Sequence, residues 1–199
     1  MTFIIPEGLA PEVYPLAWLV GRWHGEGVVG YPGIDESAFT QDVDLTHDGG
    51  PYLAYTSTIR LVAAPDHASA LTDPDAAVVP AEPGPVWSTE SGYWRVPPER
   101  PEGLADDHAP VEVLLADPAG HLSLYLGAVG NGRIDLVSDL VARTSSAAEV
   151  TSGKRLYGLV NGDLMWAFDL AAFGHPMQTY ASARLVRADG PSTHDEEQP

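Results

Sequence analysis

Histidine and acidic side chains are the groups in this chain that could ligate a metal or transfer protons. The chain has seven histidines and 28 acidic residues but no cysteine, which excludes disulfides, thiolate metal sites and a cysteine nucleophile. No G-x-S-x-G, H-E-x-x-H, Walker or Rossmann motif occurs in the sequence. The histidines show no metal-ligand spacing; they are His24, His47, His67, His108, His121, His175 and His194. These side chains therefore predict neither a metal site nor a catalytic residue.

The most informative short motif is G-x-W-x-G-x-G, which spans residues 21–27. In a strand, alternate residues share a face, so the motif places Gly21, Trp23, Gly25 and Gly27 together on the inward side. Glycine in a strand costs about 0.5–1 kcal/mol relative to alanine, so several glycines on one face need a reason. Either a sharp bend closes the fold over Trp23, or the missing side chains leave internal volume for a flat ligand. The two explanations are compatible, and both stay open.

The elements that position this motif are strands. From residue 22 onward, short runs with β-type alternation are separated by turn residues, and Asn161-Gly162 is the strongest hairpin signal. A short helix is predicted over Val13–Val20, with Pro15 near its first turn. Because sequential antiparallel strands in such number favour closure, we predict an all-β fold, a closed antiparallel up-and-down β-barrel. About ten strands are predicted, near residues 22–31, 36–46, 51–62, 87–96, 111–117, 121–129, 132–141, 147–160, 163–173 and 177–187.

Composition predicts one domain with two interruptions and a tail. The barrel is expected over residues 1–188, with Pro-rich acidic surface insertions near 63–85 and 97–110, and the acidic segment 189–199 is expected to be disordered. A net charge of −18 argues against nucleic acid and anionic membranes as partners. The sequence shows no basic leader and no run of about 20 apolar residues, so we expect a cytoplasmic location.

The motif at residues 21–27 resembles the signature of the nitrobindins, which are β-barrel haem proteins related in shape to fatty-acid-binding proteins. A lone G-x-W is shared with lipocalins, but an ordered set of further segments makes the resemblance specific. It covers nearly the whole chain apart from the two insertions and the tail. The further segments are Tyr31-Pro32, His47–Tyr55, Glu90–Arg95, Val111–Leu114, Glu149-Val150, Gly174–Gln178 and Ser182–Leu185.

The resemblance implies ferric haem b, nitric oxide binding and isomerisation of peroxynitrite to nitrate. It also implies that the iron is held by a histidine in the last strand, two residues before a Ser-Ala pair. Tyr180 stands at that position in this chain. A haem-contacting threonine is implied after the Tyr-Pro pair, where this chain has Gly33. Both cofactor-binding positions implied by the resemblance are therefore changed.

Strand alternation leaves the direction of Tyr180 open. An unbroken last strand puts its side chain on the same face as Gln178, Ser182 and Arg184. Either the barrel mouth has a polar lining, or a β-bulge shifts the alternation. As substitute ligands, His175 is expected to be exposed in the preceding turn, and His121 is expected to lie at the surface.

Three functions follow from these residues. The preferred hypothesis is a nitrobindin-like barrel without histidine-held haem, whose cavity is empty, partly filled or occupied by a small apolar ligand. No cofactor is expected in that case, and the protein is not an enzyme. The alternative is a ferric haem b protein that isomerises peroxynitrite and uses Tyr180, as a tyrosinate, for the axial ligand. A third hypothesis is a scaffold whose acidic insertions contact a partner.

Overall fold

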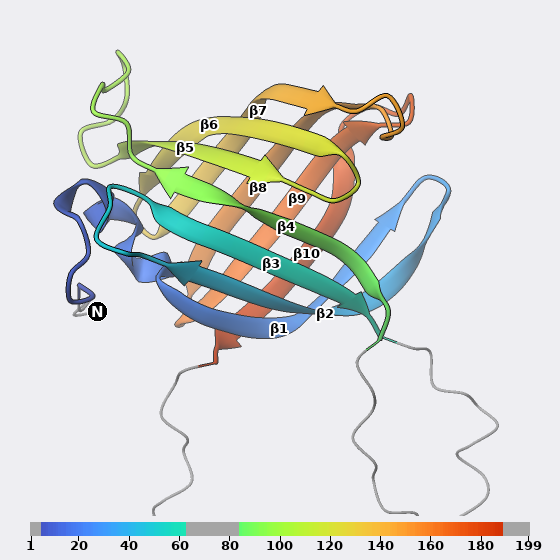
Figure 1. Ribbon diagram of the computed structural model, residues 1–199, viewed down its shortest axis with the longest axis horizontal. Helices are drawn as coiled ribbons and strands as arrows, with labels where there is room; N and C mark the ends of the chain where they lie inside the picture. Colours follow the sequence, from blue (N-terminus) through green and yellow to red (C-terminus); the bar gives the residue numbers. More distant parts are fainter. Residues whose placement is uncertain (1–4, 63–83, 189–199) are drawn as a thin grey trace, which may run out of the picture.

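The computed structural model describes residues 5–62 and 84–188, which form one closed barrel of ten antiparallel strands (Figure 1). Each strand pairs with its neighbours in sequence, and β1 also pairs with β10, which closes the barrel. The predicted fold class is therefore confirmed. The tail at 189–199 and residues 63–83 of the first insertion lie outside the described residues. The elements are the 3₁₀-helix η1 (Pro11–Leu19) and the strands β1 (Gly21–Tyr31), β2 (Ile34–Thr46), β3 (Leu53–Leu61), β4 (Val86–Arg95), β5 (Ala109–Ala116), β6 (His121–Gly130), β7 (Arg133–Arg143), β8 (Val150–Val160), β9 (Asp163–Ala172) and β10 (Gln178–Arg187).

Two Asn-Gly turns join neighbouring strands in the second half of the barrel. In the turn between β8 and β9, the φ angles are 53° at Asn161 and 93° at Gly162. In the turn between β6 and β7, they are 53° at Asn131 and 72° at Gly132. Positive φ at both central residues gives a turn whose twist matches that of the strands. The predicted hairpin at Asn161-Gly162 is therefore confirmed.

The helix η1 closes one end of the barrel, near the N-terminus in Figure 1. It begins at Pro11, two residues before the predicted start, and its apolar side chains join the core. Trp23 of β1 donates a hydrogen bond from Nε1 to the carbonyl oxygen of Leu19 over 2.8 Å, which ties the helix end to the barrel wall. In the described ranges, no helix has the length and apolarity needed to cross a membrane. The opposite end of the barrel is the mouth.

The second insertion lies at the closed end. Residues 97–108 connect β4 to β5 through turns on the same end of the barrel as η1 (Figure 1). Arg100 donates to the carbonyl oxygens of His108 over 2.6 Å and Leu104 over 3.1 Å, and also to that of Ala105. This segment therefore does not border the mouth.

Close packing accounts for the glycines of the G-x-W-x-G-x-G motif. A Cβ atom at Gly25 would overlap the main chain of Arg184 on β10 and approach Leu185 Cα to 2.8 Å. A Cβ atom at Gly27 would overlap the ring of Phe39, which is fully buried. Trp23 itself is 1% exposed. The glycines thus let β10 and Phe39 pack tightly against β1, which agrees with the bend-and-closure explanation.

We expect Gly27→Ala to destabilise the barrel by about 1–3 kcal/mol, because the added methyl forces Phe39 and β10 to move. Urea unfolding of purified protein measures this loss. Gly158→Ala on β8 is the matched control, since a Cβ atom there has no neighbour within 4 Å. Equal stability of the two variants would contradict the packing explanation.

Candidate functional site

Two adjoining cavities occupy the barrel. The inner cavity has a volume of about 50 Å³ and lies among side chains of the core, including Trp94, Tyr157 and Trp166. The mouth cavity has a volume of about 390 Å³. Its wall carries five aromatic rings, those of Trp87, Tyr125, Phe168, Phe173 and Tyr180. Both cavities have Ser88, Glu90, Phe168 and Tyr180 in their walls, so these residues stand where the two meet.

A β-bulge turns Tyr180 into the barrel. Where β10 pairs with β9, Thr179 lies opposite Asp169 and Ala181 lies opposite Phe168, so Tyr180 has no partner on β9. Beyond the bulge, Ala181 is buried and Arg184 is exposed. Two successive residues, Tyr180 and Ala181, therefore face inward, as a bulge permits. Of the two alternatives left by the sequence, the bulge is the one that the structure contains.

The Tyr180 hydroxyl accepts a hydrogen bond from Trp87 Nε1 over 2.8 Å. Its ring packs edge-on against Phe168 and Tyr31, with centroids 5.7 Å and 6.0 Å away. Burial raises the pKa of Tyr180 above its ordinary value of 10, although the hydrogen bond from Trp87 acts in the opposite direction. The phenol is therefore neutral at physiological pH.

Gly33 lies in the turn that joins β1 to β2. It is exposed, its φ angle is 85°, and a Cβ atom at this position would have nothing within 4 Å. The positive φ favours glycine here. Its neighbour Ile34 contributes to the wall of the mouth cavity, whereas Gly33 does not. This position therefore supplies no side chain to the cavity.

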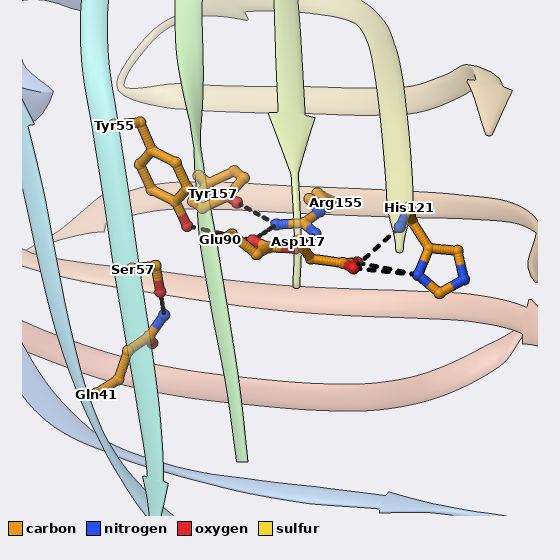
Figure 2. A network of polar contacts seen from close by, with 8 residues as sticks. All are labelled: Gln41, Tyr55, Ser57, Glu90, Asp117, His121, Arg155 and Tyr157. Carbon is orange, nitrogen blue, oxygen red and sulfur yellow. Dashed lines mark hydrogen bonds and ion pairs between the residues drawn. The ribbon is translucent and has the colours of Figure 1, made fainter. Parts of the chain in front are cut away.

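The histidines near the mouth are His121 and His175. The side chain of His121 is only 10% exposed and borders the mouth cavity, so its expected surface position is wrong. Its Nδ1 lies 3.1 Å from an Asp117 carboxylate oxygen (Figure 2). Its Nε2 lies 2.9 Å from the carbonyl oxygen of Ala148. His175 is exposed as expected and packs edge-on against the ring of Tyr31. Both ring nitrogens of His121 are therefore engaged.

A buried ion pair is the feature that sequence reasoning missed. Arg155 on β8 is 7% exposed and binds Glu90 on β4 through both terminal nitrogens, with Nη1 to Oε2 at 2.8 Å (Figure 2). The guanidinium carbon lies 4.3 Å above the ring centroid of Phe168. The Tyr157 hydroxyl lies 3.5 Å from Nη1 of Arg155, and the Tyr55 hydroxyl lies 3.5 Å from Oε2 of Glu90. Charge, hydrogen bonds and aromatic contact thus hold one arginine inside the barrel.

A sequence signal for this pair existed. Along β8, Gly153, Arg155 and Tyr157 alternate on the buried face, which places an arginine at an inward position. Since buried arginines are almost always paired, the alternation predicts an internal acid. It does not say which of 28 acidic residues that is.

We expect stability to fall at alkaline pH because burial raises the pKa of Tyr55, Tyr157 and Tyr180. The folded protein keeps these protons to higher pH than the unfolded chain, so the stabilisation is complete below about pH 10 and is lost above it. Each such tyrosine contributes a slope of about 1.4 kcal/mol per pH unit. Urea unfolding across this range measures the slope, and Tyr180→Phe should make it shallower by one such contribution. If the slope of stability against pH is the same in Tyr180→Phe as in the wild-type protein, Tyr180 does not contribute to it.

In residues 5–62 and 84–188, no group of three or more histidine and acidic side chains is placed to hold a metal ion. The site is instead a mouth cavity with five aromatic rings in its wall above a mainly apolar interior that holds the neutralised Arg155–Glu90 pair. A barrel plugged at one end, hollow inside and open at an apolar mouth has the architecture of the single-chain β-barrels that take small ligands.

Comparison with known proteins identifies the family. Residues 12–187 match the family described as the THAP4-like, heme-binding beta-barrel domain. The chain is 51% identical to the ferric nitrobindin-like protein of Beutenbergia cavernae, over 94% of this chain and 99% of that protein. It is 42% identical to the peroxynitrite isomerase of Parafrankia sp., over 90% of this chain and 81% of that protein. This chain belongs to the nitrobindin family of THAP4-like haem-binding β-barrel domains.

A solved structure supports the same relationship. The crystal structure of Rv2717c from M. tuberculosis superimposes with a TM-score of 0.69 at 28% sequence identity. The match covers 90% of this chain and 98% of that chain. The barrel is therefore similar over its full length to a solved relative.

Proposed function

We propose that this chain is a nitrobindin-family barrel that holds a small, mainly apolar molecule in its mouth cavity and does not bind haem through a histidine. The observation that carries the proposal is the state of Tyr180, which stands where the family resemblance implies the iron-ligating histidine. Burial raises the pKa of its phenol, and its oxygen accepts the hydrogen bond from Trp87. A phenol that keeps its proton is a poor iron ligand.

The other groups at the mouth do not fit a haem iron. An axial ligand needs a free lone pair directed at the metal. Both ring nitrogens of His121 face oxygen atoms, of Asp117 and Ala148, and Gly33 contributes no side chain where the resemblance implies a haem contact. On this proposal the protein is a binding protein and not an isomerase.

The mouth cavity suits a small organic ligand. Its volume of about 390 Å³ falls within the usual range of such pockets, and five aromatic rings together with aliphatic side chains give it apolar surface. The names of the relatives fall into two groups, which agrees with the presence of both kinds of protein in the family. The relatives at 51% and 44% identity are named ferric nitrobindin-like proteins, whereas the relatives from Parafrankia and Clavibacter at 42% and 40% are named peroxynitrite isomerases.

A second candidate function is ferric haem b binding with Tyr180 as the axial ligand, which would make the protein a peroxynitrite isomerase. The inward direction of Tyr180 and the N–H of Trp87 aimed at its oxygen favour this candidate, since a donor stabilises a phenolate. Bound haem would supply a Lewis-acidic iron at the mouth.

Titration of the purified protein with haemin separates the two functions. We expect no saturable change in the visible spectrum of the wild-type protein, because the phenol of Tyr180 keeps its proton and both ring nitrogens of His121 face oxygen atoms. A one-to-one complex with tyrosinate charge-transfer bands that disappear in Tyr180→Phe would contradict the proposal and support the second candidate.

A further inference from the structure

Two donors in the wall of the inner cavity lack a hydrogen-bond partner in the described part of the chain. They are Nε1 of Trp94 and Nε of Arg155, on side chains that are 1% and 7% exposed. Both residues line the inner cavity. An unsatisfied buried donor costs about 1–3 kcal/mol, so a group that accepts from them gains that energy.

The remaining polar groups around the inner cavity are hydroxyls, which can donate or accept, or groups that are already bonded to one another. Trp166 Nε1 donates to Gln41 Oε1 over 2.8 Å, and Gln41 Nε2 donates to Ser57 Oγ over 2.8 Å, so this chain of bonds is internally satisfied (Figure 2 shows its Gln41–Ser57 part). The Tyr180 hydroxyl accepts from Trp87, and this is its only hydrogen bond to the described residues. Its proton is therefore available. A ligand group that bonds to the two unpartnered N–H groups must be an acceptor.

The charges of the interior decide between a neutral and an ionic acceptor. Arg155 and Glu90 neutralise each other through two hydrogen bonds. Because the pair is neutral overall, it does little to offset the hydration that a carboxylate or an ammonium group loses on entering this interior. An uncharged acceptor avoids this cost.

We propose, resting on the function proposed above, that the ligand is an uncharged molecule with an apolar body in the mouth cavity and one carbonyl-type acceptor that reaches Trp94 and Arg155. Ketones, esters and lactones belong to this class. The body packs against the aromatic wall, and the carbonyl passes the boundary formed by Phe168 and Tyr180, which border both cavities. Apolar burial supplies affinity, and the two donors supply selectivity.

A matched series of probes tests this class. Butyrophenone carries the ketone, butylbenzene lacks it, phenylbutyrate is anionic and phenylbutylamine is cationic. We expect butyrophenone to bind the full-length protein about tenfold or more tightly than each of the other three, as measured by calorimetry. The indole N–H resonance of Trp94 should also shift downfield with butyrophenone alone, because the hydrogen bond forms only there.

Two variants test whether Trp94 and the Arg155–Glu90 pair determine the preference for an uncharged carbonyl compound. Trp94→Phe should reduce the preference for butyrophenone over butylbenzene to about threefold or less, because the phenyl ring has no N–H to donate. Trp23→Phe is the matched control, since its Nε1 is bonded to Leu19 and its ring lines neither cavity. Glu90→Gln exposes the ligand to the charge of Arg155, so phenylbutyrate should gain about tenfold in affinity.

The outcomes are distinguishable. Equal binding of butyrophenone and butylbenzene, an unmoved Trp94 resonance, or an unchanged preference in Trp94→Phe overturns the carbonyl assignment, because ordered water alone then satisfies the two donors. The function proposed above survives each of these results. Absence of saturable binding for all four probes overturns both proposals together.

Discussion

Tyr180→His should create or strengthen haem binding in this barrel. The bulge at residue 180 already directs this side chain to the boundary of the two cavities, and imidazole binds iron without first losing a proton at neutral pH. We expect a one-to-one haemin complex at least about a hundredfold tighter than any wild-type interaction, which corresponds to ~2.7 kcal/mol. Haemin titration followed in the visible spectrum measures the affinity.

The control for this variant is Tyr180→Phe, which keeps the ring and removes the hydroxyl that accepts from Trp87. It should bind haemin no better than the wild-type protein. A Tyr180→His protein that folds normally and still does not bind haemin would show that the cavity cannot admit a porphyrin. The identity of residue 180 would then not decide whether this barrel binds haem.

Glu90→Leu should be among the most destabilising single substitutions in the barrel, with a loss of about 3–5 kcal/mol. The substitution leaves the guanidinium of Arg155 unpaired, and this side chain is only 7% exposed. Its contacts with the rings of Phe168 and Tyr125, at 4.3 Å and 5.0 Å, do not replace a carboxylate. Urea unfolding monitored by tryptophan fluorescence measures the free energy of unfolding.

The double variant Glu90→Leu with Arg155→Met should recover most of that loss, because it removes both charges and keeps apolar volume in their place. Asp135→Ala is the surface control. Its side chain is 60% exposed and pairs with Arg133, and surface pairs contribute little to stability. If the double variant is as unstable as Glu90→Leu, packing around residue 90 and not the unpaired charge accounts for the loss.

Much of the barrel was predictable because its signals are local. The alternation in β1 places Trp23 inside and His24 outside, and the structure agrees, with His24 exposed and 2.7 Å from Asp42. Asn161-Gly162 predicts its hairpin because the turn depends only on the backbone preferences of two residues. The family resemblance likewise depended on ordered short segments, and the comparisons bear it out.

The candidate site was predictable only in part. The family resemblance drew attention to Tyr180. An unbroken strand would place its side chain on the same face as Arg184, which is exposed, whereas the bulge in β10 turns it inward. His121 was expected at the surface, yet hydrogen bonds to Asp117 and Ala148 hold it in the wall of the mouth cavity. Each of these details depends on contacts between strands.

The sequence alone specifies the strands, their turns and the tyrosine at the position where the resemblance implies a ligand, since these depend on neighbours a few positions apart. Only the closed barrel decides that Tyr180 faces inward and that Arg155 meets Glu90, which are 65 residues apart. The physical reason is that a bulge arises from the pairing of β10 with β9, and a buried ion pair forms across a barrel that must first close. Local periodicity indicates the inward face of a regular strand, whereas bulges and contacts between distant residues depend on the tertiary structure.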